Sequence, residues 1–144
     1  MKTRYSSLVS IKKDAMQKSE GVLQEALATL HNAEEAYADA LRALQNITTP
    51  QSGKIVQFLS YRQLLDAQRR VIEETKEWVS FAGSQVKQAQ ESLKKAMMEY
   101  EKFNYLEVEE IKRIIKQQKL QEAKDLDEIA LLTFTKKSST GAFL

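Results

Sequence analysis

The chain has 144 residues, 42% hydrophobic and 29% charged, with four glycines and one proline, a composition that favours long helices over a layered sheet. Its 22 basic and 20 acidic side chains are interspersed and leave a net charge of +2, which gives no electrostatic footprint for a nucleic-acid partner. The absence of cysteine excludes disulfides, a thiol nucleophile and thiolate metal sites, and it fits a reducing compartment such as the cytoplasm.

A first helix is predicted over about residues 3–47, because apolar and small residues recur there at the heptad spacing of a coiled coil. The positions are Tyr5, Val9, Lys12, Met16, Ser19, Leu23, Ala26, Leu30, Ala33, Tyr37, Ala40, Leu44 and Ile47. A turn is predicted to follow at residues 48–53, where Pro50 and Gly53 stand among small polar residues.

A second helix is predicted over about residues 54–134, since no helix breaker occurs before Gly141. Its heptad positions are Phe58, Tyr61, Leu65, Gln68, Ile72, Thr75, Val79, Ala82, Val86, Ala89, Leu93, Ala96, Tyr100 and Phe103. The sequence therefore predicts an all-α chain. Its two long helices would form an antiparallel coiled-coil hairpin, one domain over residues 1–135, with the C-terminal helix extending beyond the paired region.

The heptads allow more than one register. Pairing Ile47 with Phe58 and Tyr5 with Tyr100 keeps both heptads in phase, and we prefer it because it leaves a roomy turn. A shift by one heptad would preserve the phase equally well.

The heptad falters after Phe103, because Glu107 and Glu110 would occupy core positions. The remainder of the second helix then has no partner in its own chain, and we expect it to bind a partner protein. Whether isolated chains pair through it stays open. Residues 136–144 hold lysines, serines and a threonine and are predicted to form a disordered tail.

The sequence offers no candidate for a catalytic, cofactor-binding or metal-binding residue, and we expect a protein that is not an enzyme. A seam between two helices is too narrow to enclose a substrate pocket. His31, the one histidine, falls on the outer flank beside Leu30 and is expected to lie on the surface. No apolar run reaches the roughly 18 residues that span a bilayer, so membrane insertion is not expected.

Two surfaces are candidates for protein contacts. Lys112, Lys116 and Lys119 share one helix face next to Arg113 and would suit an acidic rim on a partner, although an ordinary solvated face explains them as well. Near the turn, apolar and aromatic residues exceed what a two-stranded seam needs, and a second docking site would explain the surplus. These are Tyr37, Leu41, Phe58, Tyr61 and Leu64.

Particular residues carry a family resemblance over nearly the whole chain. They are the N-terminal Tyr5, Leu8, Ile11 and Lys12 and the stretch from Gln118 to Ala130, which contains Leu-Asp-Glu-Ile-Ala at residues 126–130. With the unequal arms of the hairpin, they resemble the FliJ/YscO family of flagellar and injectisome type III export proteins. The customary Lys-Glu before the motif is replaced here by Lys124-Asp125.

The resemblance implies a soluble, non-enzymatic stalk of the export apparatus that sits in the pore of the hexameric export ATPase FliI. It places the protein in the cytoplasm, at the inner face of the membrane, and implies contacts with export chaperones. Candidate ATPase contacts are Lys112, Arg113, Lys116, Lys119, Leu126, Asp127, Glu128 and Ile129. The turn end would face the export gate FlhA, through Tyr37, Leu41, Leu44, Phe58, Tyr61 and Leu65.

Other functions are compatible with the same pattern. An escort or holdase chaperone would hold an unfolded or export-bound client on its unpaired apolar stripes and would bind promiscuously. A plain structural spacer would tolerate loss of the unpaired helix end. Flagellar and injectisome systems are not distinguished by the residues alone.

Overall fold

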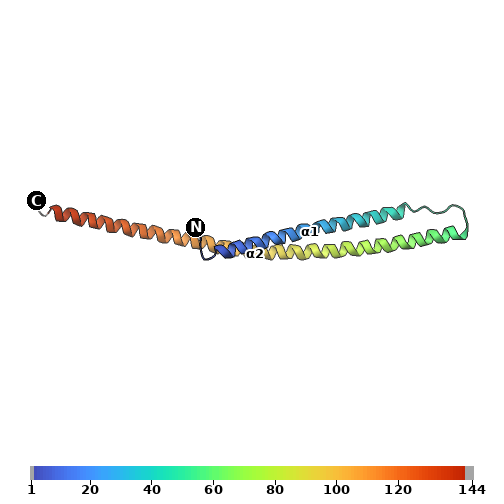
Figure 1. Ribbon diagram of the computed structural model, residues 1–144, viewed down its shortest axis with the longest axis horizontal. Coiled ribbons are helices and arrows are strands. Elements are labelled where there is room, and N and C mark those ends of the chain that lie inside the picture. Colours follow the sequence, from blue (N-terminus) through green and yellow to red (C-terminus); the bar gives the residue numbers. More distant parts are fainter. Residues whose placement is uncertain (1, 142–144) are drawn as a thin grey trace. The chain divides into compact units, whose positions relative to one another are not determined.

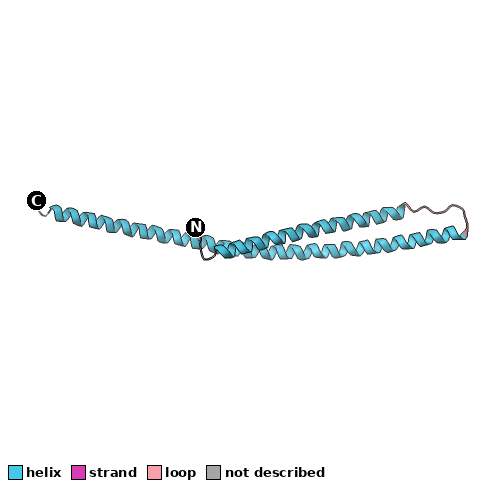
Figure 2. Ribbon diagram, viewed as in Figure 1, coloured by secondary structure: helices cyan, strands magenta, loops and turns pink. Residues whose placement is uncertain are grey.

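The computed structural model describes residues 2–141, with side chains described for residues 2–137. Two helices, α1 (Ser6–Gln45) and α2 (Ile55–Gly141), account for nearly all of this part of the chain, and it contains no strand (Figures 1 and 2). The helices pack against each other, which confirms the predicted all-α helical hairpin.

The ends of the helices differ from the predicted ones. The connecting segment is longer than expected and covers residues 46–54, between the end of α1 and the start of α2. At its other end α2 continues to Gly141, past the expected end at Phe134. The prediction of a disordered tail from residue 136 is therefore wrong for residues 136–141, where no proline or glycine interrupts the helix before Gly141. Residues 142–144 lie outside the described residues.

The chain divides into two compact units, where the sequence predicted one domain. Unit 1 contains Met1–Lys12 and Glu99–Leu144, and unit 2 contains Lys13–Met98. A two-helix seam makes contacts only with its immediate neighbours along its length, because no central core ties distant parts together. Each unit is therefore described by itself.

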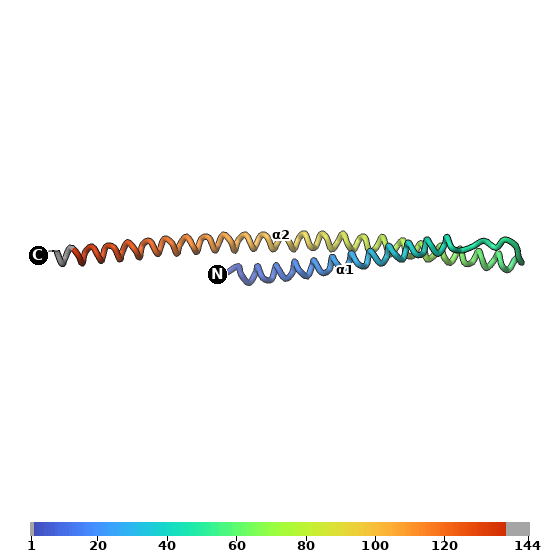
Figure 3. Tube along the Cα trace, turned by 90° about the horizontal axis from the view of Figure 1, so that it is seen from above, coloured from blue at the N-terminus to red at the C-terminus, as the bar shows by residue number. Residues whose placement is uncertain are grey.

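In unit 2, α1 and α2 lie side by side and bury mainly small side chains in the seam (Figures 1 and 3). The fully buried residues are Ala33, Ala40, Ala82, Val86 and Ala89. All of them occupy predicted heptad positions, and from Met16 to Ala96 the other predicted positions in this unit are half-buried except Phe58, which is 44% exposed. The heptad spacing therefore identified the correct face of each helix. Alanines in the seam allow the two backbones to approach closely.

Two polar contacts between the helices are offset from the preferred register. In unit 1 Lys12 Nζ lies 3.5 Å from Glu99 Oε2, although the preferred register placed Lys12 opposite Leu93. In unit 2 Gln68 Nε2 donates to the backbone carbonyl of Ala40 at 2.8 Å, although Gln68 was expected opposite Tyr37. Both contacts are offset in the same direction. A heptad shift leaves every apolar position in phase, so the apolar pattern alone does not distinguish the registers.

Two glycines inside the helices offer a test of how tightly unit 2 is packed. A Cβ atom added at Gly21 or Gly83 would meet nothing within 4 Å. We therefore expect Gly21→Ala and Gly83→Ala each to raise the free energy of unfolding by about 0.5–1 kcal/mol, through lower chain entropy in the unfolded state. Chemical denaturation followed by circular dichroism measures the change.

A contrasting variant is available at Gly53, whose φ of 157° is a conformation that side chains rarely adopt. Gly53→Ala should lower the free energy of unfolding under the same conditions. Loss of stability in Gly21→Ala or Gly83→Ala would mean that the helices approach each other more closely than described.

Candidate functional site

Side chains of the types found in catalytic and metal sites lie at the surface of this protein. His31 is exposed, and its Nε2 lies 3.0 Å from Glu35 Oε1 on the same helix. Within the described residues, no group of three or more His, Asp or Glu side chains is placed to hold a metal ion. None of the described helices is long and apolar enough to cross a membrane.

Unit 1 holds the start of α1 through a polar cluster that we call the N-terminal clasp, formed by Thr3, Arg4, Ser6, Glu107 and Glu110. Ser6 Oγ accepts a hydrogen bond from the Thr3 amide at 2.8 Å, and Thr3 Oγ1 accepts one from the Tyr5 amide at 3.1 Å. The pair caps the first turn of α1 like a capping box with serine in the fourth position, except that Thr3 Oγ1 binds the Tyr5 amide and not that of Ser6. Ser6 Oγ in turn donates to Glu107 Oε1 of α2 at 2.9 Å.

Glu110 is the second carboxylate of the clasp. Arg113 donates to both of its oxygens, at 2.7 and 3.2 Å, and Arg4 Nη2 lies 3.8 Å away. The hydrogen bonds from Arg113 hold the pKa of Glu110 below its ordinary value of 4.5; partial desolvation opposes this shift, and the charges of Arg113 and Arg4 add to it. The first turn of α1 has no acidic residue of its own, so α2 supplies the negative charge that the positive end of the α1 dipole favours.

The clasp was not predicted, although its signal was present in the sequence. In the heptad pattern Glu107 and Glu110 mark the point where pairing is predicted to stop, because charges at heptad positions disrupt an apolar seam. In the structure they are the residues that bind α1, so the pairing of the helices extends further along α2 than expected. The position of Thr3 three residues before Ser6 was the recognisable cap signal.

Ile114 is the last half-buried residue of α2 among those whose side chains are described. Every side chain from residue 115 to residue 137 is exposed, and we call this segment the overhang. Most of the predicted ATPase contacts lie on it, namely Lys116, Lys119, Leu126, Asp127, Glu128 and Ile129. Lys112 and Arg113 come just before it and are engaged within α2, where Lys112 Nζ lies 3.4 Å from Glu109 Oε1 and Arg113 binds Glu110.

The overhang contains a short stretch that is apolar on all sides. Leu131, Leu132 and Phe134 are 65%, 70% and 72% exposed, and Ile129 is 59% exposed. Successive residues of a helix point 100° apart, so these side chains project around its whole circumference. A helix that is apolar all round is one that a partner surrounds.

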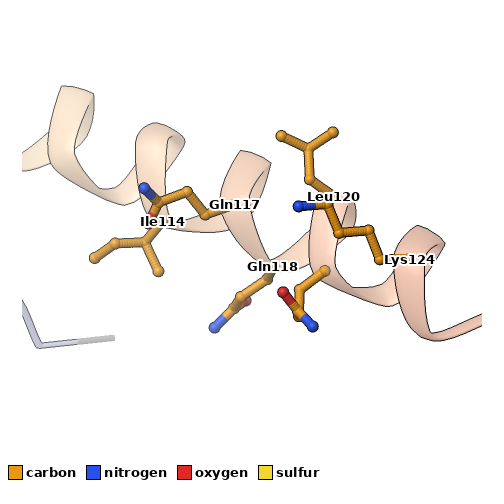
Figure 4. Close-up of a pocket in the computed structure, with 6 residues that line it drawn as sticks. Ile114, Gln117, Gln118, Leu120 and Lys124 are labelled. Carbon is orange, nitrogen blue, oxygen red and sulfur yellow. The ribbon is translucent and has the colours of Figure 1, made fainter.

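Polar side chains fill the first half of the overhang. Figure 4 shows Gln118 and Leu120 projecting from opposite sides of α2, with Gln117 and Lys124 nearby. Together with Ile114 and Gln121 they line a shallow, open hollow on the helix surface. A hollow lined by one helix cannot enclose a small molecule.

The turn end of unit 2 carries the predicted gate contacts. Phe58 and Leu41 are 44% and 37% exposed, while Tyr37, Leu44, Tyr61 and Leu65 are half-buried in the seam. The Tyr61 hydroxyl lies 3.2 Å from Thr49 Oγ1 and ties the connecting segment to α2. An open groove of about 470 Å³ runs between this segment and α2, with Ile47, Pro50, Val56 and Leu64 among its lining residues.

Comparison with known proteins identifies one relationship. The family model described as the flagellar FliJ protein matches residues 1–139, almost the entire chain. No curated protein and no solved structure matches. Of the two export systems that the sequence left open, the match is to the flagellar one.

The clasp makes a prediction about the start of α1. We expect Glu107→Ala to free the Ser6 hydroxyl and loosen the first turn of α1, so that hydrogen exchange of its amides becomes several-fold faster. Exchange across Lys13–Met98 should not change. The matched control is Glu109→Ala, which removes a neighbouring carboxylate that contacts only Lys112. Equal exchange rates in the two variants would show that Glu107 does not hold α1.

Acid should loosen the same turn. Because the folded pKa of Glu110 is lowered, its ion pairs contribute stability above about pH 4.5 and lose it as the pH falls through the folded pKa. Arg113 remains charged throughout, because its hydrogen bonds to Glu110 raise its pKa. Nuclear magnetic resonance of the Ser6 amide between about pH 7 and pH 3 should therefore report fraying at the acid end. Glu110→Gln should reduce that pH dependence, and an unchanged profile would exclude Glu110 as its source.

Proposed function

The chain belongs to the flagellar FliJ protein family, and on that basis we propose that it is a stalk that joins the hexameric export ATPase FliI to the export gate FlhA. Membership of this family makes it a component of flagellar type III protein export. In the proposed role it acts in the cytoplasm at the inner face of the membrane, and it is not an enzyme, because ATP hydrolysis belongs to the ring.

One observation supports the ATPase contact above the others. Ile129, Leu131, Leu132 and Phe134 expose apolar surface around the whole circumference of α2. A flat partner would cover only one side of such a helix, whereas the pore of a ring would surround it. Lys116, Lys119, Asp127 and Glu128 then lie within reach of charged side chains on the pore wall.

The gate contact is proposed for the turn, which belongs to unit 2. The apolar side chains of Phe58 and Leu41 are exposed in this part of unit 2, and a groove lies along the connecting segment. Half-buried Tyr61 and Leu65 would hold that surface in place rather than contact the gate directly. Aromatic side chains held by a rigid helix lose little entropy on binding, which favours them as anchors.

The proposed mechanism is coupling between two binding sites. If the ring binds one end of the chain more tightly in one nucleotide state, the chain biases the gate toward the state that its other end prefers. The coupling requires that each end bind its own partner. Export chaperones are further proposed partners, on the family resemblance alone.

An escort chaperone is the competing proposal. The exposed apolar residues on which it depends extend along both helices, among them Ile11 and Val22 of α1 and Phe81 of α2. A holdase would use many of these surfaces, so single changes in the overhang would have little effect. A stalk depends on a short segment.

The test is ATP hydrolysis by FliI with the full chain and with a chain that ends after Lys124. This truncation removes the apolar stretch and keeps the clasp, so the hairpin should remain intact. We expect the full chain to increase ATP hydrolysis. The truncated chain should need a concentration at least about tenfold higher for the same increase, which corresponds to a loss of roughly 1.4 kcal/mol in binding free energy. The truncated chain should still bind the cytoplasmic part of FlhA.

A matched pair of point variants separates this segment from exposed apolar surface in general. Leu131→Ser with Leu132→Ser should weaken stimulation. Ile55→Ser with Leu59→Ser, at residues 79% and 55% exposed, should not. Equal stimulation by all variants would reject the ATPase contact, and protection of an unrelated unfolded protein from aggregation would then favour the chaperone.

A further inference from the structure

One face of α2 in unit 1 carries apolar side chains on both sides of a charged centre. We call it the overhang stripe, formed by Val108, Ile111, Ile115, Lys119, Glu122, Leu126 and Ile129. These positions recur every three or four residues and so share one side of the helix. The exposed fractions of Ile115, Leu126 and Ile129 are 39%, 66% and 59%.

The stripe is complementary to itself when its direction is reversed. Positions taken symmetrically about the point between Leu120 and Gln121 pair Lys119 with Glu122 and Ile115 with Leu126. In two antiparallel copies each of these pairs occurs twice, as a two-fold interface requires. Ile115 and Leu126 are 11 residues apart, which is three turns of a helix with about 3.67 residues per turn. Both side chains therefore lie on the same face and can contact the same neighbouring helix.

The charges at the centre of the stripe are available for such a contact. Within the described residues, no hydrogen bond or ion pair involves Lys116, Lys119, Glu122 or Asp127. By contrast, the preceding Lys112 and Arg113 bind Glu109 and Glu110 on their own helix. The free charges therefore coincide with the self-complementary positions.

We propose that the overhang stripe binds the same stripe of a second copy of this chain, antiparallel, about a two-fold axis between Leu120 and Gln121. Lys119 of each copy pairs with Glu122 of the other, and Ile115 packs against Leu126. Lys116 lies on the same flank as Asp127 of the second copy and adds a further attraction. The clasp stays intact, because its contacts use Glu107 and Glu110, which lie beside the stripe.

The pairing is independent of the proposed stalk function and would compete with it. It covers Lys119, Leu126 and Ile129, which are also candidates for contact with the ATPase ring. A copy that is paired with another cannot present these residues to a ring. The dimer would then be a form in which free chains shield their apolar overhangs from other proteins, and dissociation would precede docking.

Sedimentation velocity of the full chain, from about 1 µM to about 1 mM, tests the proposal. We expect a monomer–dimer equilibrium in which K119E or E122K raises the dimer dissociation constant at least about tenfold, because each creates two like-charge contacts. The double variant K119E/E122K should restore dimerisation. So should an equimolar mixture of the two single variants, because only their heterodimer pairs opposite charges at both contacts.

The control is K124E, which makes the same charge change on the opposite side of α2. It should dimerise like the unaltered chain. A monomer at every concentration would overturn the proposal, and so would equal dissociation constants for K119E, E122K and K124E. Far-UV circular dichroism of each variant confirms that its helices are intact.

The absence of cysteine from the chain allows the direction of pairing to be tested as well. On mixing I115C with L126C, mild oxidation should give the mixed disulfide dimer. I115C alone should not cross-link efficiently. Efficient cross-linking of I115C to itself would indicate a parallel pair and would overturn the antiparallel two-fold interface.

Discussion

The narrow seam between α1 and α2 is the constraint from which the rest of this protein follows. Each helix buries one stripe of residues, and the most deeply buried of these are alanines and one valine, so the remaining circumference of both helices faces water. Such a seam leaves no interior for a substrate or a cofactor. It does leave long exposed surfaces, held rigidly by backbone hydrogen bonds, on which proteins can bind.

A seam of this kind only weakly determines which residue of α1 lies opposite which residue of α2. An apolar stripe of small residues offers nearly the same packing after a slide of one heptad, so polar contacts at the ends carry much of the specificity. Here Ser6 binds Glu107 and Gln68 binds the Ala40 carbonyl, each in its own unit. Charged residues at heptad positions that are usually apolar therefore hold the start of α1 on α2. The same carboxylates complement the positive end of the α1 dipole.

The overhang shows how one helix can carry several separate surfaces. Its apolar stretch at residues 129–134 projects on all sides, which supports the proposal of a partner that surrounds it. Its stripe from Val108 to Ile129 lies on one side and is complementary to itself. Since the two proposed surfaces share Ile129, binding of a ring would exclude binding of a second copy. Competition of this kind would keep exposed apolar residues covered until the correct partner arrives.

The sequence by itself determined the helices, the turn, the buried face of each helix and the family, because heptad spacing, a lone proline and a terminal motif are local features of the chain. It also marked Glu107 and Glu110 as unusual. The register, the extent of pairing and the clasp were decided only by the tertiary structure. The reason is physical: a slide of seven residues leaves the apolar pattern unchanged, whereas the contact that fixes it joins Ser6 to Glu107, which are 101 positions apart in the chain.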